Sequence, residues 1–341
     1  MNEPFAKNDI KIAVVGGGTG SFTLLSALKK HTKQLAAIVN MSDDGGSTGV
    51  LRDELGVLPP GDVRQCLVAL SDSPKVRDLF NYRFEEGTFG GHSFGNILIT
   101  ALEKVTGDFS EAIQTASEIL RVSGTVIPAT LDNVRLKMEW PGASIILQGE
   151  RVIVADYFKH DPRRAVLSLT PSAAANPMAL KAIEQADVVV IAPGDMYSSL
   201  GPLLVIDGIA EALRKTDAIC VYVSNLVTKY GQTVDFTVSD HAGEIERFVG
   251  ESFLDYVFYN EQIPTKELAR RYKKEDAYLV KVDRSALRKA SYIAIPGNFL
   301  GKMAGRSKSD ILMAKRPLIR HDADAVAKVL LDLYDQTNKR H

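Results

Sequence analysis

The sequence has little of several things that narrow the function of a protein. Two cysteines in 341 residues, Cys66 and Cys220, are too few for a disulfide framework or a cysteine-rich metal site. The 41 Lys and Arg residues balance 42 Asp and Glu residues to a formal charge of −1, so no basic field attracts nucleic acid or an anionic membrane. No apolar run approaches the roughly 20 residues of a membrane span, and the first residues lack the apolar region of a signal peptide. We therefore expect a cytoplasmic protein that binds any anionic ligand at a local site.

Short apolar runs rich in Val and Ile alternate with helical patterns along the chain. The runs lie at residues 11–15, 35–40, 187–192, 218–223 and 256–259, and the helical patterns at 21–31, 93–105, 108–122, 176–186, 202–215 and 322–334. This alternation predicts an α/β fold, Rossmann-like and doubly wound, with a mainly parallel sheet and helices on both faces. Alternating segments around a Pro-Gly turn predict a small antiparallel hairpin at 131–155, inserted in a single domain that spans 10–336.

The first strand runs directly into a glycine-rich turn, residues 16–20 (GGGTG), and then into a helix. In this context backbone N–H groups and the helix N-terminus point at an anion, and the missing Cβ atoms let phosphate oxygens approach. The strict dinucleotide fingerprint is not met, because Ser21 occupies the third glycine position, and there is no Walker A motif. The turn predicts a phosphate or diphosphate site; tight packing of strand on helix is the alternative.

Two adjacent acids, Asp43 and Asp44, begin a polar loop with Gly45 after the second strand, at the edge where open α/β sheets bind ligands. Their oxygens suit Mg²⁺ shared with substrate phosphates, or the hydroxyls of a sugar. Asp62 follows in a PPGD segment at the start of a helix. The alternative for each acid is a turn or capping role, which Asp often has.

Three further loops carry polar side chains. Residues 90–96 (GGHSFGN) form a second glycine turn that opens a helix, which suits an anion or sugar, although a lone histidine is more often structural. Residues 193–200 (PGDMYSSL) and 224–228 (SNLVT) each follow a strand. One shared cleft explains these strand ends better than separate turns. No catalytic triad, catalytic cysteine, zinc-ligand spacing or glycosidase carboxylate pair is evident in the sequence. The residues therefore indicate a nucleotide or sugar-nucleotide site, and whether this site also holds a metal ion stays open.

Several segments together resemble one family from about residue 11 to about residue 335. They read GGGTGS, SDDGGSTGVLRDELGVLPPGDVRQCLVAL, LFNYRF, GGHSFGNILITAL, APGDMYSSL and SNLVTKYGQTVDFTVSDH. They resemble the YvcK/CofD-like superfamily, and within it the bacterial gluconeogenesis factor (YvcK) branch. Members of that branch bind UDP-sugars, notably UDP-N-acetylglucosamine, and support gluconeogenic growth, cell shape and cell-envelope homeostasis.

The resemblance implies a UDP-sugar-binding regulatory protein that has a protein signalling partner. The related CofD branch implies the alternative, a 2-phospho-L-lactate transferase-like enzyme. Such an enzyme moves a phospholactyl or phosphoenolpyruvyl group from a guanosine diphosphate derivative to a deazaflavin, with Mg²⁺. Whether the chain turns over a substrate stays open at this point. A homodimer is the expected assembly on general grounds.

The resemblance also assigns roles to individual residues. Asp44 and Asp62 match positions that handle metal and acceptor in the transferase branch. A tyrosine and an arginine that contact the UDP-sugar correspond to Tyr272 and Arg320, which without the family would be an amphipathic helix residue and a surface charge. The candidate ligand-binding residues are Gly16, Gly17, Gly18, Thr19, Gly20, Asp43, Asp44, Gly45, His92, Ser93, Asn96, Gly194, Tyr197, Ser198, Asn225, Tyr272 and Arg320.

The sequence departs from the branch pattern in the later loops. Asp195 stands in a loop that is usually PGSLYTS-like, where its charge would weaken phosphate binding unless a metal or another cation intervenes. Residues 229–233 (KYGQT) replace a PGET-like segment, and the basic stretch at 298–317 lengthens the chain between Tyr272 and Arg320.

Overall fold

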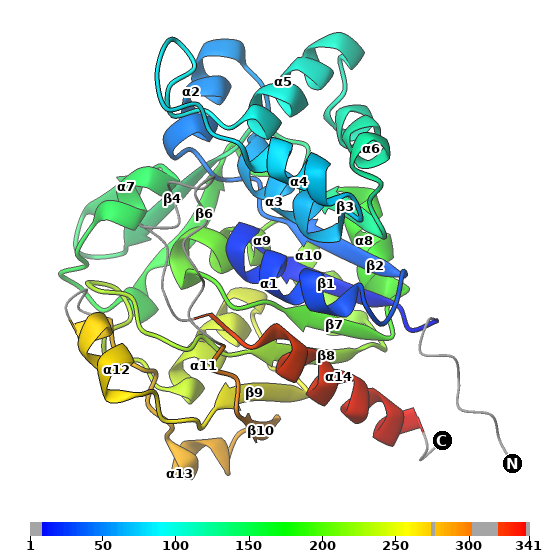
Figure 1. The fold of residues 1–341 in the computed structure, drawn as a ribbon. Helices are drawn as coiled ribbons and strands as arrows, with labels where there is room; N and C mark the ends of the chain where they lie inside the picture. Colours follow the sequence, from blue (N-terminus) through cyan, green and yellow to red (C-terminus); the bar gives the residue numbers. More distant parts are fainter. Residues whose placement is uncertain (1–8, 274–276, 302–319, 339–341) are drawn as a thin grey trace, which may run out of the picture.

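The structure, a computed structural model, describes residues 9–273, 277–301 and 320–338 (Figure 1). Its main element is a parallel sheet of seven strands in the order β10-β9-β8-β7-β1-β2-β3. The strands are β1 (Ile12–Gly16), β2 (Leu35–Val39), β3 (Thr125–Pro128), β7 (Val188–Ile191), β8 (Ile219–Val223), β9 (Tyr256–Asn260) and β10 (Ile293–Gly297). The strand order reverses between β1 and β7, which is where open α/β sheets form their ligand-binding crevice.

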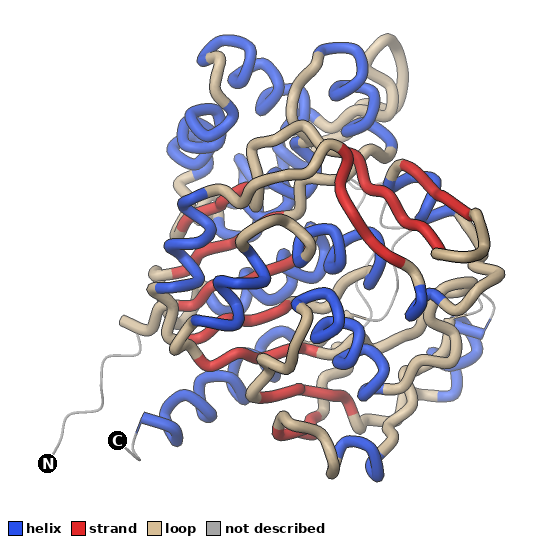
Figure 2. The backbone as a smooth tube through the Cα atoms, turned by 180° about the vertical axis from the view of Figure 1, so that it is seen from behind, coloured by secondary structure: helices blue, strands red, loops and turns tan. Residues whose placement is uncertain are grey.

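Both faces of the sheet are covered, as Figures 1 and 2 show from opposite sides. In β1, Ile12 and Val14 join one buried apolar cluster, whereas Ala13 and Val15 join the other. The first cluster contains α1 (Gly18–Leu28), α3 (Pro60–Leu70), α5 (Phe94–Thr106), α6 (Phe109–Leu120) and α14 (Ala323–Asn338). The second contains α8 (Pro177–Glu184), α9 (Gly201–Leu204), α10 (Ile209–Lys215) and α11 (Val238–Val249). Burial on both faces explains why the central strands are continuous apolar runs.

A smaller antiparallel sheet, in the order β5-β4-β6, packs into the second cluster. Its strands are β4 (Arg135–Trp140), β5 (Ile145–Gln148) and β6 (Val166–Thr170), and β4 alternates buried with half-buried residues, as a strand with one covered face does. The predicted fold class is confirmed. Part of the expected hairpin segment differs, because residues 150–155 form a helix. The assignment of 10–336 to one domain and of 131–155 to an insertion stays a prediction.

The described residues contain seven further helical elements, of which the five α-helices are labelled in Figure 1. They are α2 (Gly46–Leu55), α4 (Pro74–Asn81), α7 (Glu150–Ala155), α12 (Lys266–Lys273), α13 (Arg284–Leu287), the 3-10 helix η1 (Pro162–Arg164) and the π-helical turn η2 (Met196–Leu200). Within the described ranges no helix has both the length and the apolar character that a membrane span requires. Cys66 on α3 and Cys220 on β8 are buried and unpaired.

Candidate functional site

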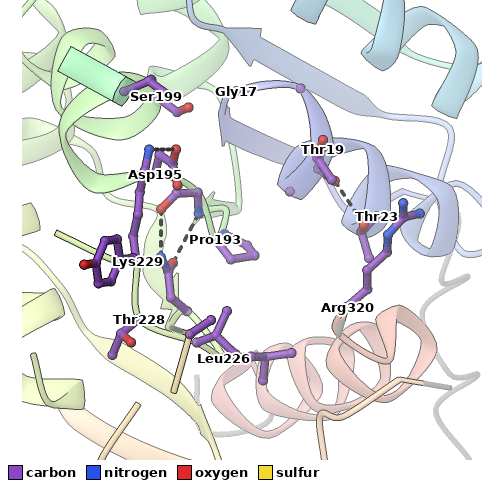
Figure 3. A pocket seen from close by; sticks show the side chains of 18 of the residues that line it. Gly17, Thr19, Thr23, Pro193, Asp195, Ser199, Leu226, Thr228, Lys229 and Arg320 are labelled. Carbon is purple, nitrogen blue, oxygen red and sulfur yellow. Dashed lines mark hydrogen bonds and ion pairs between the residues drawn. The ribbon is translucent and has the colours of Figure 1, made fainter. Parts of the chain in front are cut away.

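A cavity of about 690 Å³ lies beside the carboxyl ends of β1, β7 and β8, where the strand order reverses (Figure 3). Four segments form most of its wall: the glycine turn at 17–20, the loop after β7 at 193–195, the loop after β8 at 225–230, and the end of α7 with the residues after it, 154–157. Thr23, Asp62, Ser199, Ala277, Arg320 and His321 complete it. Its volume is in the range of pockets that hold small organic ligands.

The glycine turn brings the first turn of α1 to the cavity. No side chain caps this helix at Gly17, so its first N–H groups and the positive end of its dipole are suited to an anion. A Cβ at Gly20 would lie 1.7 Å from the carbonyl oxygen of Pro193, and one at Gly18 would lie 2.4 Å from Oδ1 of Asp62. Glycine is needed here because the turn is packed between the loop after β7 and the helix that carries Asp62.

The side chain of Asn225 joins the loops after β7 and β8. The backbone N–H of Gly194 donates to Oδ1 of Asn225 at 3.2 Å, and Nδ2 of Asn225 donates to the carbonyl oxygen of Gly194 at 2.8 Å. The next residue, Asp195, directly precedes η2, and its backbone carbonyl oxygen accepts the N–H groups of Ser199 and Leu200 at the end of η2. Gly194 and Asn225, both candidates from the sequence, thus lie together in the cavity wall.

An ion pair spans the same two loops. Nζ of Lys229 lies 2.5 Å from Oδ2 of Asp195, and the two side chains are 25% and 43% exposed. Lys229 was not among the sequence candidates. Its ammonium group balances the charge of Asp195, and it stands in the segment that departs from the branch pattern.

Two tyrosines form another part of the wall, and sequence reasoning missed both. Tyr157 follows α7 and Tyr230 follows Lys229; each is more than half exposed, and their ring centroids are 5.5 Å apart in an edge-to-face arrangement. The backbone N–H of Phe158 donates to the carbonyl oxygen of Gly231 at 2.9 Å, which joins the two loops. Exposed aromatic rings in a cavity wall suit the face of a planar base or of a sugar ring.

Arg320 and His321 bring the late part of the chain to the cavity. Nε2 of His321 lies 3.0 Å from the carbonyl oxygen of Ser224; because a carbonyl only accepts, we assign the proton to Nε2. Burial lowers the pKa of His321 to about 4, so its imidazole is neutral at neutral pH. The other residue that the resemblance assigns to the ligand, Tyr272, belongs to α12. Its side chain lies outside the described part of the structure, as do residues 302–317 of the basic stretch.

Asp44 has a structural position outside the cavity lining. Its carboxylate accepts from Nη1 of Arg135 at 3.1 Å and from the backbone N–H groups of Glu150 and Arg151 at 3.2 and 2.8 Å, at the N-terminus of α7. Asp43 accepts from the backbone N–H of Gly45 at 2.9 Å, as an aspartate in a turn does. None of these three candidates lines the cavity.

These contacts test how well the chain fits a magnesium ion. In the described ranges no group of three His, Cys, Asp or Glu side chains is placed to hold a metal. Asp44 does not fit the role, because Arg135 and the first N–H groups of α7 occupy its oxygens. Asp62 lines the cavity beside Gly18 and fits the single carboxylate that Mg²⁺ often uses together with ligand phosphates. Magnesium at Asp62 stays a prediction.

A second polar group forms where α2, α3 and α5 meet. Oγ of Ser47 lies 3.0 Å from Nδ1 of His92 and accepts from Nδ2 of Asn96 at 3.3 Å, while Nε of Arg64 donates to Oδ1 of Asn96 at 2.9 Å. Ser93 caps α5 by accepting the backbone N–H of Asn96. His92, Ser93 and Asn96 are therefore brought together, but they do not line the cavity.

The remaining candidates lie behind the cavity wall. Tyr197 is fully buried, and its hydroxyl donates to Oε2 of Glu244 at 2.9 Å; burial, followed by the charge of Glu244, raises its pKa. Ser198 is also buried and donates to Asp195 at 3.4 Å. Gly16 is the last residue of β1. The side chains of Tyr197 and Ser198 thus support the loop after β7, and none of the three residues lines the cavity.

Comparisons with known proteins agree on the family. The family model described as "2-phospho-L-lactate transferase CofD" matches residues 12–300. The protein named "Gluconeogenesis factor" from Bacillus subtilis is 36% identical over 95% of this chain and 98% of its own length, and the one from Listeria innocua is 37% identical over 96% and 97%. A crystal structure of a UPF0052 family member from Bacillus halodurans superposes with a TM-score of 0.84 at 36% identity, covering 95% of this chain and 99% of that one. This chain therefore belongs to the CofD/YvcK family, among the gluconeogenesis factors.

Proposed function

We propose that this chain is a regulatory protein that binds a nucleotide sugar of the UDP-N-acetylglucosamine type in the cavity beside β1, β7 and β8. The observation that carries the proposal is the placement of an uncapped helix N-terminus and two cationic side chains, Lys229 and Arg320, around one cavity at the reversal of strand order. A diphosphate is an anion that such donors bind well.

Two parts of the cavity match two parts of this ligand. The glycine turn offers uncapped backbone N–H groups and Arg320 offers positive charge, and both suit the diphosphate. Tyr157 and Tyr230 offer exposed aromatic faces, which suit a base or sugar ring. A cavity of about 690 Å³ has room for both kinds of group.

In this proposal the ligand reports on carbon supply, and a protein partner recognises the ligand-bound state in the cytoplasm. This links the chain to gluconeogenic growth, cell shape and the cell envelope. The proposed assembly is a homodimer. The family membership and the lack of a membrane-spanning helix in the described ranges are compatible with this role.

The second candidate is a CofD-like transferase that uses Mg²⁺ and a nucleoside diphosphate donor. Two observations favour it: the family model that matches residues 12–300, and Asp62, whose carboxylate lies beside the glycine turn in the cavity. The structural use of Asp44 favours the binding protein, because the second acid expected at a metal is occupied elsewhere.

Ligand-dependent stability separates the two candidates. Purified protein is heated with UDP-N-acetylglucosamine, UDP-glucose, GDP or NAD, each with and without Mg²⁺. A ligand at 100 times its Kd stabilises the folded state by about 2.7 kcal/mol, so the UDP-sugar should raise Tm by several degrees. Stabilisation by GDP with Mg²⁺ and by no UDP-sugar would favour the transferase and overturn the proposal.

A matched pair of variants ties the effect to the cavity. Arg320→Met should reduce the Tm shift caused by UDP-N-acetylglucosamine, because it removes a cation from the wall. Arg284→Met removes an arginine that pairs with Glu261 and does not line this cavity. Equal loss of the Tm shift in both variants would mean that the overall charge, and not the cavity, controls binding.

A further inference from the structure

The loop that carries Asp195, one partner of the ion pair with Lys229, packs against the glycine turn. A Cβ at Gly17 would lie 3.1 Å from Cβ of Ser199, and one at Gly20 would lie 1.7 Å from the carbonyl oxygen of Pro193. Asp195 lies between these two contact points in sequence, and its backbone oxygen accepts the N–H of Ser199. The backbone of the loop that carries Asp195 therefore packs against the glycine turn, while the ion pair itself lines the cavity.

The backbone positions of both partners are fixed, but their side chains are accessible. Lys229 begins a turn in which its N–H donates to Oγ1 of Thr233 at 2.9 Å and its carbonyl oxygen accepts the N–H groups of Gln232 and Thr233. Asp195 is fixed between Gly194 and η2. Both side chains line the cavity and are 25% and 43% exposed. A ligand can therefore reach the pair without rearrangement of either loop.

The charged side chains of the cavity wall indicate how the ion pair would affect the binding of an anion. The acids Asp62, Asp156 and Asp195 and the cations Lys229 and Arg320 line the cavity. While Lys229 is paired with Asp195, little of its charge is available to an anionic ligand. If a phosphate takes the place of the Asp195 carboxylate, the ammonium group makes a charge-assisted hydrogen bond to the ligand. In Figure 3 the pair lies across the cavity from Thr19, Thr23 and Arg320, so a ligand between them would have a cationic side chain on each side, Lys229 and Arg320.

We propose that Lys229 is a phosphate-binding residue of this cavity and that Asp195 is its exchangeable counter-ion, which a diphosphate displaces when it binds. The inference rests on the proposed function, because it concerns the same cavity. It also states which ligands the cavity favours: a diphosphate can compete with a carboxylate for the ammonium group, whereas an uncharged nucleoside cannot.

Opposite effects of two single substitutions test the inference. Binding of UDP-N-acetylglucosamine, inorganic diphosphate and uridine is measured by calorimetry. Lys229→Met should weaken binding of the two diphosphates about 10- to 100-fold, the range for loss of a hydrogen bond to a charged group. Asp195→Asn should strengthen it about 3- to 10-fold, because it removes a competitor for Lys229 and a like charge. Binding of uridine should change less than twofold in either variant.

The control is an ion pair of the same type away from the cavity. Nζ of Lys215 lies 2.5 Å from Oε1 of Glu211 on α10, and Lys215→Met changes the net charge by the same amount as Lys229→Met. It should leave diphosphate affinity within twofold. An equal loss in Lys215→Met and Lys229→Met would overturn the inference, because the effect would then come from net charge.

The outcomes also separate this inference from the proposed function. If the pair only clamps the two loops, both single variants weaken diphosphate binding and both lower Tm, which overturns the exchange. If UDP-N-acetylglucosamine binds the unchanged protein but the two variants do not shift its affinity in opposite directions, the inference fails and the proposed function stands. If inorganic diphosphate binds with the expected pattern but no nucleotide does, the inference stands and the proposed function fails. If neither inorganic diphosphate nor a nucleotide binds, both the inference and the proposed function are overturned.

Discussion

Asn225 pairs with the backbone of Gly194 through both ends of its side-chain amide, at 2.8 and 3.2 Å, much as a neighbouring strand would. This contact continues the link between β7 and β8 beyond the last paired residues of the two strands. It holds the loop that carries Asp195 to the loop after β8. The amide side chain of Asn225 therefore helps to fix the position of this cavity wall, together with the ion pair between Lys229 and Asp195.

Asn225→Asp should loosen this wall. The substitution replaces the donor with a carboxylate oxygen that faces the carbonyl oxygen of Gly194, so one hydrogen bond is lost and a repulsion is gained. We expect the free energy of unfolding to fall by about 2 kcal/mol, measured by urea denaturation, and binding of UDP-N-acetylglucosamine to weaken. Unchanged stability and affinity would show that the backbone alone holds the loop.

Gly20→Ala should be strongly destabilising. Its Cβ would lie 1.7 Å from the carbonyl oxygen of Pro193, and backbone atoms cannot move aside as the end of a side chain can. We expect a loss of more than about 3 kcal/mol in the free energy of unfolding. Gly243→Ala is the control, because a Cβ there meets nothing within 4 Å in the middle of α11, and it should stabilise by about 0.5 to 1 kcal/mol. Equal effects at both positions would contradict the close approach.

Glu150 predicts a pH dependence of stability. Burial raises its pKa to about 8, with smaller contributions from Asp43, Asp44, Asp62 and Asp195. The folded state thus binds this proton more tightly than the unfolded state, whose pKa is near the ordinary 4.5. Stability from this group is complete below about pH 4.5 and is lost as the pH rises toward about 8.

Glu150→Gln removes the charge at nearly constant shape and should abolish that loss. We expect the free energy of unfolding of the variant to exceed that of the unchanged protein by about 2 kcal/mol at pH 8 and by little at pH 5. The full pKa shift of Glu150 would correspond to a larger difference, but its carboxyl group is partly exposed and solvent screens it. Denaturant titrations from pH 5 to 8.5 measure the difference. Glu118→Gln, at an exposed position, should leave the curve almost unchanged. A constant difference between Glu150→Gln and the unchanged protein across this range would contradict the assignment.

Tyr157 and Tyr230 should contribute to affinity more than to stability. Both are more than half exposed and line the cavity, so removing either ring costs little packing. Stacking of a base on an aromatic side chain is worth about 1 to 3 kcal/mol, so Tyr230→Ala should weaken nucleotide binding about tenfold. Tyr82→Ala is a matched control, because Tyr82 is also exposed and packs edge-to-face on Phe84 outside the cavity. If uridine and UDP-N-acetylglucosamine bind equally well before and after Tyr230→Ala, the ring does not contact the ligand.

The sequence predicts the centre of the fold better than its edges. The five predicted strands are β1, β2, β7, β8 and β9, which have neighbours on both sides. The strands that were not predicted in the main sheet, β3 and β10, are its two edges. β10 contains Pro296 and has no buried residue, so it lacks the apolar run by which a central strand is found. The third strand of the small sheet, β6, is likewise an edge strand with a single buried residue.

In the candidate site, the sequence predicts residues that belong to local motifs and misses residues whose partners are far away along the chain. The glycine turn, Gly194 and Asn225 were predicted because a strand, a polar loop and a helix follow one another in the sequence. The sequence does not predict the structural role of Asp44, because its partner Arg135 is 91 residues away along the chain. Lys229 and Tyr157 were missed because nothing local shows that a loop after β8 and the end of α7 reach the same cavity.

The cavity wall draws on residues from Gly17 to His321, which gives ligand binding a consequence for folding. Neither half of the sheet forms the wall alone, so partial unfolding of either half would release the ligand. The free energy of ligand binding therefore raises the free energy of unfolding of the whole molecule, and not only the stability of one loop. Ligand should accordingly slow amide hydrogen exchange across the central strands as well as at the surfaces it touches.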